Sequence, residues 1–130
     1  MIGIVIVAHG GLAKEYLAAV EHVVGAQTSV VAISINAVHD RAEKQKEICA
    51  AADKVDTGDG VVVVTDMFGG SPSNLSLHAC KPQNRKILYG ANLPMLIKLA
   101  KSRHLDLNEA VNRALNAGRK YIDCFDGAPS

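Results

Sequence analysis

The stretch Ile-Gly-Ile-Val-Ile-Val-Ala at residues 2–8 decides the fold. It is a near-continuous aliphatic run without polar alternation, which is typical of a strand buried on both faces. Two further runs have the same character: Ser-Val-Val-Ala-Ile-Ser-Ile at residues 29–35 and Val-Val-Val-Val-Thr at residues 61–65. The second of these is the most β-branched, so we expect it to be a central strand. A short fourth strand is expected at residues 86–89.

Apolar residues at helical spacing occupy the segments between these strands. The expected helices include residues 13–24, about 40–53 and about 93–101. Another begins with Ser71 as N-cap, followed by Pro72. The last helix starts at Asp106, which forms a capping-box pattern with Glu109. Gly25 and Gly118 are the expected ends of the first and last helix.

The alternation of strand and helix predicts parallel strands joined by right-handed crossovers. We therefore expect one α/β domain over residues 1–130, an open, doubly wound, mainly parallel sheet with helices on both faces. Residues 121–125 could add a fifth strand.

Composition excludes several classes of protein. Of the 130 residues, 48% are hydrophobic and 21% charged, and the formal net charge is +1, which is average for a globular domain. We expect no nucleic-acid partner because no strong positive field is present. We expect no membrane insertion because the apolar runs are far shorter than the roughly 18 residues of a span. Met1 leads directly into the first strand, without the basic segment of a signal peptide. The three cysteines form no C-x-x-C pair, which favours the reducing cytoplasm and three mostly buried thiols.

Residues that could take part in a reaction follow the first and third strands. The first strand runs into His9, and the third into Asp66 and the turn Gly69-Gly70-Ser71-Pro72. If these strands are near neighbours, both side chains emerge at the same edge of the sheet, where α/β proteins bind ligands. An imidazole is a nucleophile when one nitrogen is free and the other donates to a carboxylate. The amides of a glycine-rich turn before a helix favour an anion. The pattern indicates a histidine that accepts a phosphoryl group.

Each feature taken alone has an ordinary explanation. His9 could be a loop residue, Asp66 a capping acid, and the glycine pair a plain strand-to-helix turn; their joint placement carries the hypothesis. No ATP or dinucleotide motif is present, so no cofactor is expected. A zinc site would draw on His9, His39 and Asp66, but no short ligand spacing supports it, so no metal is expected. Packing or exposure to solvent is the default for the remaining histidines, His22, His78 and His104.

Three segments carry a resemblance to a known family. They are Ile-Val-Ile-Val-Ala-His-Gly at residues 4–10, Asp-Met-Phe-Gly-Gly-Ser-Pro at 66–72 and Gly-Ala-Asn-Leu-Pro-Met-Leu at 90–96. Over essentially its whole length the chain resembles the IIA domain of the mannose/fructose/sorbose class of the bacterial phosphoenolpyruvate-dependent phosphotransferase system. The resemblance implies a phosphotransferase in which His9 is phosphorylated and Asp66 orients it. It also implies that Gly69, Gly70 and Ser71 face the phosphate, while residues 92–95 are structural.

The same resemblance implies partners. Phospho-HPr would donate to His9, and a IIB component would accept, in sugar uptake or in a regulatory phosphorelay. A homodimer is implied in which residues 121–125 pair with the neighbouring subunit's sheet. Met67 and Phe68 stand where the best-known sugar-transport members carry Thr-Trp, so we expect a different partner-facing surface.

Two alternatives remain open. One is a phosphoryl-donor subunit for dihydroxyacetone kinase. The other is a non-catalytic regulatory binding module on the same fold, against which the joint presence of His9, Asp66 and the glycine turn argues.

Overall fold

The computed structural model describes residues 1–128, and a four-stranded parallel sheet forms its centre. The strand order is β2-β1-β3-β4, and the strands are β1 (Gly3–His9), β2 (Val30–Ile35), β3 (Val61–Thr65) and β4 (Arg85–Leu88). The predicted strands at residues 2–8, 29–35 and 61–65 are confirmed to within one residue, and β4 begins one residue earlier than predicted. β3 lies inside the sheet, as its β-branched composition predicted.

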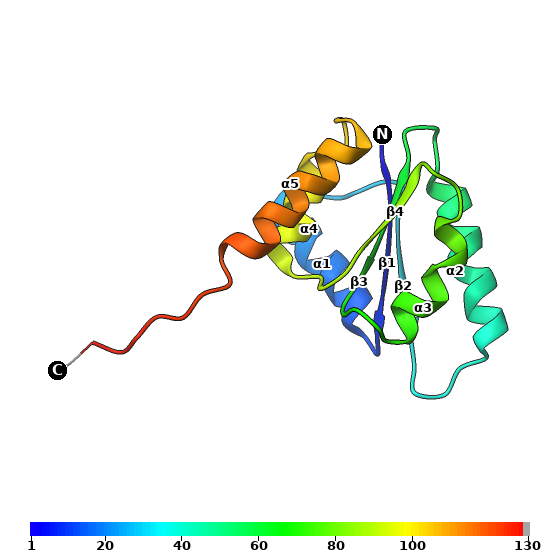
Figure 1. Ribbon diagram of the computed structural model, residues 1–130, viewed down its shortest axis with the longest axis horizontal. Helices are drawn as coiled ribbons and strands as arrows, with labels where there is room; N and C mark the ends of the chain where they lie inside the picture. Colours follow the sequence, from blue (N-terminus) through cyan, green and yellow to red (C-terminus); the bar gives the residue numbers. More distant parts are fainter. Residues whose placement is uncertain (129–130) are drawn as a thin grey trace.

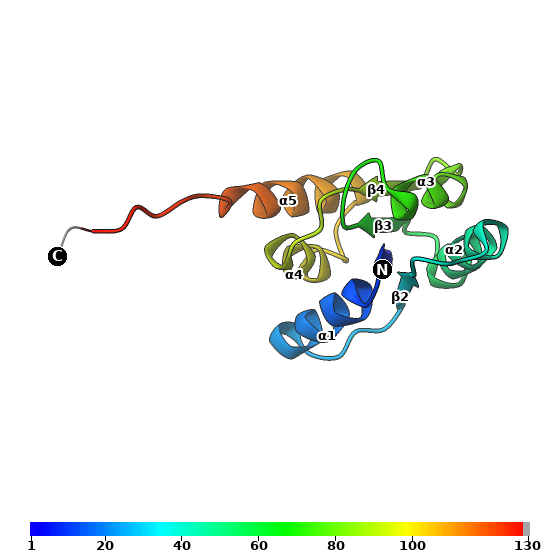
Figure 2. The ribbon, with the colours of Figure 1, turned by 90° about the horizontal axis from the view of Figure 1, so that it is seen from below.

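Helices pack on both faces of the sheet. One face is covered by α1 (Leu12–Val24), α4 (Leu93–Lys101) and α5 (Leu107–Lys120). The other is covered by α2 (Arg41–Val55), α3 (Ser71–Ser76) and the short 3₁₀ helix η1 (His78–Cys80). Figure 1 shows these two groups on either side of the strands, and Figure 2 shows the layers from below. The predicted doubly wound α/β class is confirmed.

Alternating side chains of β1 and β3 build two hydrophobic cores. Ile4 and Ile6 face the layer of α1, α4 and α5, whereas Val5 and Val7 face the layer of α2 and α3. Six of the seven residues of β1 are buried, and His9 is the exposed one. Because apolar burial stabilises by roughly 25 cal/mol per Å², these two strands are the best-anchored part of the backbone. They end at the site described below.

Two predicted helix ends, at Gly25 and Asp106, are confirmed, two others are wrong, and Asp40 provides a further cap. Gly25 ends α1, Asp40 accepts a hydrogen bond from the Glu43 amide at 3.0 Å, and Asp106 accepts one from the Glu109 amide at 3.3 Å. Gly118 does not end the last helix, which continues to Lys120. Glycine at this position allows α5 to pack closely on α4, because a Cβ there would lie 3.1 Å from two atoms of Met95 in α4. Ser71 is not an N-cap, because Gly70 takes that position.

The segment after α5 leaves the body of the molecule. Residues 122–128 form neither helix nor strand, and Figure 1 shows them extending away from the sheet. Ile122 and Phe125 are exposed, because nothing among the other residues of 1–128 covers them. The fifth strand expected at residues 121–125 is therefore absent from the single chain. Its pairing with a neighbouring subunit stays a prediction. Within residues 1–128, no helix combines the length and apolar character needed to cross a membrane.

Candidate functional site

His9 stands at the carboxyl end of β1 and projects beyond the sheet. The next residue, Gly10, has φ of 55°, a left-handed conformation that glycine adopts without strain. Its amide donates to the Ile35 carbonyl at 2.9 Å, which turns the chain away from the strand direction immediately after His9. The imidazole is left at the rim with 46% of its side chain exposed. A stiff strand thus positions a reactive side chain that solvent and partners can reach.

Asp66 lies beside His9 because β1 and β3 are adjacent and parallel. Val7 pairs with Thr65, so the residues that follow the two strands emerge together. Asp66 Oδ2 accepts the His9 backbone N–H at 3.0 Å and lies 2.7 Å from His9 Nδ1. When Nδ1 carries the proton and donates to this carboxylate, Nε2 keeps its lone pair. The structure therefore brings together the two residues that the sequence analysis linked.

The second oxygen of this carboxylate is unusual. Asp66 Oδ1 is buried and has no hydrogen-bond partner within residues 1–128. A buried, unpaired carboxylate oxygen is costly to the folded state. A buried polar atom without a partner calls for an explanation, and a role in a reaction is one. The charge of Asp66 is consequently not shared with other donors and acts on His9.

Gly70 packs against the imidazole on the side of Nε2. A Cβ at this position would lie 3.0 Å from His9 Cε1 and 3.4 Å from His9 Nε2. Any side chain here would press on the ring and cover the free nitrogen. Glycine is thus needed here because the loop comes close to the nucleophile, and not because the backbone adopts a left-handed conformation.

Ser73 shapes the glycine turn, and the sequence analysis missed it. Its Oγ accepts the Gly69 N–H at 3.0 Å and donates to the Gly70 carbonyl at 3.1 Å. The Gly69 amide is therefore engaged within the chain, whereas the Gly70 and Ser71 amides make no hydrogen bond within residues 1–128. The signal that could have found Ser73 is its place in the first turn of a helix, where serine bonds back to the preceding loop.

The remaining histidines do not join this pair. His39 lies after β2 with Nδ1 2.9 Å from the Asn36 carbonyl. His22 belongs to α1, His78 to η1, and His104 lies between α4 and α5. In the described part of the chain, no group of three or more His, Cys, Asp or Glu side chains could hold a metal ion.

The cysteines are free thiols and differ in exposure. Cys49 and Cys80 are partly buried and Cys124 is exposed, so the expectation of three mostly buried thiols is wrong. Burial raises the pKa of Cys49, and it raises the pKa of Cys80 to about 11. Neither of these two thiols is an activated nucleophile.

With this geometry in view, comparison with known proteins identifies the family. Residues 3–115 match the model of the PTS system fructose IIA component. The chain belongs to this family. It is 29% identical to the mannose-specific EIIAB component of Escherichia coli strain K12, and the match covers 98% of this chain and 41% of that protein. The chain thus spans less than half of the curated relatives that it matches.

Solved IIA structures share the fold. A phosphotransferase system component EIIA from Streptococcus agalactiae superposes with a TM-score of 0.84 at 28% identity, with coverage of 95% of this chain and 97% of that one. A PTS IIA protein associated with the fucose utilization operon of Streptococcus pneumoniae gives a TM-score of 0.78 at 30% identity, covering 88% and 89%. The mannose/sorbose-specific IIA subunit of Enterococcus faecalis has a TM-score of 0.84 at 23% identity, covering 98% and 97%, and supports the fold alone.

Proposed function

We propose that the chain is a phosphohistidine carrier, in which His9 accepts a phosphoryl group from phospho-HPr and passes it to a IIB component. The observation that carries this proposal is the 2.7 Å contact between His9 Nδ1 and Asp66 Oδ2; when Nδ1 carries the proton, Nε2 is the free nitrogen. Membership of the IIA family supports the direction of transfer. Neither dihydroxyacetone kinase nor a purely regulatory module is favoured by the comparisons.

In the proposed step, the lone pair of His9 Nε2 forms a bond to phosphorus. The bond from phosphorus to the donor's atom breaks, and its electron pair returns to the donor. The proton on Nδ1 stays in place, so the phosphorylated ring is positively charged and the Asp66 carboxylate offsets that charge. Transfer of this kind depends on position and charge stabilisation more than on covalent chemistry by the protein.

The loop Gly69-Gly70-Ser71 is the proposed seat of the phosphoryl oxygens. Gly70 leaves open space beside Nε2, and the amides of Gly70 and Ser71 are available as donors. Gly69 contributes by shape, since Ser73 holds its N–H. The proposal places one such domain over residues 1–130, in the cytoplasm.

A homodimer is part of the proposal. The outer edge of β4 has no strand beside it among residues 1–128, and the extended segment after Lys120 presents unpaired apolar side chains. Exposed strand edges and apolar extended segments are complementary, because each leaves backbone hydrogen-bonding groups unpaired.

Intact-mass spectrometry after incubation with phosphoenolpyruvate, enzyme I and HPr tests the carrier. We expect one added phosphoryl group that is lost in acid and kept in alkali, and complete loss of labelling in His9→Ala. His104→Ala is the matched control, because it removes an exposed histidine from the opposite edge of the sheet and should label fully. Stoichiometric labelling of His9→Ala would refute the assignment.

A further inference from the structure

The surface around His9 is apolar and almost uncharged. Four segments reach this edge of the sheet: residues 9–13, 36–40, 66–71 and 89–92. They contain no lysine or arginine and two carboxylates: Asp66, which has 10% of its side chain exposed, and Asp40, which caps α2. Yet large apolar side chains are exposed here, namely Leu12, Val38, Met67 and Phe68. We call these four residues the apolar rim.

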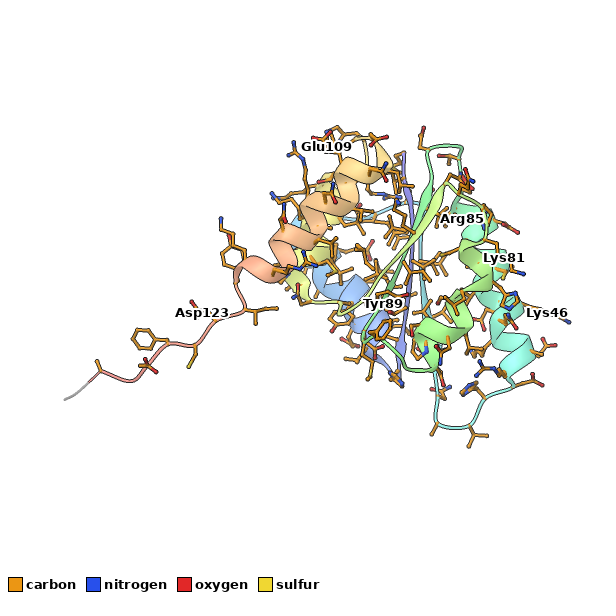
Figure 3. The ribbon with its side chains drawn as sticks, in the orientation of Figure 1. Lys46, Lys81, Arg85, Tyr89, Glu109 and Asp123 are labelled. Atoms are coloured by element: carbon orange, nitrogen blue, oxygen red, sulfur yellow. The ribbon has the colours of Figure 1, made fainter. Side chains whose placement is uncertain are left out.

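Phe68 is the most prominent aromatic of the rim. It is 75% exposed. Its ring meets Tyr89 edge-to-face, with centroids 5.0 Å apart and planes at 87°. Tyr89 follows β4 at the same edge of the sheet (Figure 3). An aromatic side chain that is held in place while exposed loses little conformational freedom when a partner covers it. Aromatic residues of this kind are enriched among the residues that dominate binding at protein interfaces.

Met67 links the rim to the nucleophile. The point at which a Gly70 Cβ would stand lies 3.5 Å from Met67 Cγ and 3.4 Å from His9 Nε2. Both atoms thus border the same small space. A donor that brings phosphorus to Nε2 therefore comes close to the Met67 side chain, and methionine is flexible enough to adapt to a partner's surface.

We propose that Met67 and Phe68 anchor a docking surface for the protein that delivers the phosphoryl group to His9. Recognition is by apolar contact, since the rim offers no exposed charge of its own, and the fitting partner surface has an apolar pocket next to its phosphorylated residue. This inference rests on the proposed function and adds the residues that select the donor. Phe68 acts on binding and not on the reacting atoms.

The test compares two phosphoryl donors on the full chain. Phospho-HPr must dock, whereas phosphoramidate, a small molecule, needs only His9. For Phe68→Ala we expect kcat/KM with phospho-HPr to fall about 30-fold, mainly through KM, as for a residue that dominates binding. Labelling by phosphoramidate should not change. Phe68→Trp should retain transfer from phospho-HPr because it keeps an aromatic face.

Val23→Ala is the matched control, because it shortens an exposed apolar side chain in the last turn of α1, at the other end of that helix. It should change neither reaction. Wild-type transfer by Phe68→Ala from phospho-HPr overturns the inference and leaves the proposed function intact. An equal loss with both donors also overturns it, because Phe68 would then shape the site itself. Wild-type protein that labels with phosphoramidate but not with phospho-HPr contradicts the proposed donor, and the inference with it.

Discussion

The two ends of the sheet are built in opposite ways. At the amino end, Arg103 is buried, and its guanidinium donates to the Ile2 carbonyl at 2.7 Å, the Ser29 carbonyl at 3.0 Å and Gln27 Oε1 at 3.3 Å. The amino group of Met1 forms an ion pair with Asp59. Polar groups at this end are tied to partners in the same chain.

A second arginine continues this arrangement on β4. Arg85 pairs with Asp53 at 2.7 Å and with Asp56 at 3.2 Å. Figure 3 shows Arg85 and Tyr89 toward opposite ends of the strand. The carboxyl end has no such network: it carries His9 half-exposed, Asp66 with one unpaired oxygen, and the apolar rim. Most polar groups described at the amino end are paired within the chain, although Arg85 Nε has no partner among residues 1–128, whereas the unpaired Asp66 Oδ1 lies beside the half-exposed His9.

The largest expected effect on stability comes from a substitution at the amino end of the sheet. Arg103→Met should lower the free energy of unfolding by about 3 kcal/mol, because the buried Ile2 carbonyl loses the donor on the Arg103 side chain and the Ser29 carbonyl keeps only the Ile4 N–H. Urea unfolding measures it, with Arg113→Met as the control. Arg113 is exposed and pairs only with Glu109 on the same helix, so its loss should cost about 0.5 kcal/mol or less. The rate of labelling by phosphoramidate should stay unchanged in folded Arg103→Met. A fall in that rate would show that the two ends are coupled.

The next largest effect comes from a substitution at the carboxyl end of the sheet. There we expect the rate of phosphorylation to change and the stability to stay nearly the same. Asp66→Ala should slow phosphorylation about 30-fold, or about 2 kcal/mol, because His9 loses a charge-assisted hydrogen bond. Its unfolding free energy should change by less than about 1 kcal/mol, since removal of the unpaired Oδ1 offsets the loss of the hydrogen bond from the His9 backbone N–H. Nitrogen-15 NMR of His9 separates positioning from stability: the Nδ1–H tautomer should dominate in wild type and lose its preference in the variant. Wild-type labelling by a folded Asp66→Ala would reduce Asp66 to a local structural role.

The smallest expected effect is a pH-dependent loss of stability when Asp56, at the amino end of the sheet, is replaced. A hydrogen bond from the Gly58 amide, followed by the pairing with Arg85, lowers the pKa of Asp56. A lowered carboxyl pKa stabilises the fold above the unfolded value of about 3.9, and this stability is lost as pH falls through the folded pKa. Asp56→Asn should therefore cost about 1 kcal/mol near neutral pH and progressively less below about pH 4.

Urea unfolding of both proteins at several pH values measures this difference. Asp53→Asn is the control, and it should cost less because that side chain is 71% exposed. A difference between wild type and Asp56→Asn that is independent of pH would contradict the assignment.

Strand identity and the pairing of His9 with Asp66 were predictable from the sequence because they rest on local patterns and one rule of topology. Aliphatic runs identify buried parallel strands, and residues after adjacent parallel strands must emerge together. The sequence could not establish that β1 and β3 are neighbours; the order β2-β1-β3-β4 supplies this.

The errors have tertiary causes. Glycine often follows the last residue of a helix, so Gly118 is the expected end of α5. In the structure, the Asn92 side chain donates to the Gly118 carbonyl at 2.8 Å, and α4 packs where a side chain at residue 118 would stand. Residues 121–125 have strand-like composition but form no strand, because a strand needs a neighbour and none lies beside them among residues 1–128; their pairing with a second subunit stays a prediction. The contact of Phe68 with Tyr89 joins two separate loops and leaves no pattern in the sequence.

The anchoring of His9 and Asp66 to the two central strands has a consequence for heating. Central strands of a well-packed sheet open only with the whole domain, whereas surface loops fray at lower temperature. The alignment of imidazole and carboxylate should therefore persist up to the melting transition. Gradual warming would first loosen the glycine turn that faces the phosphate. Activity would then decline in two stages, a shallow one as that turn becomes mobile and a steep one as the sheet melts.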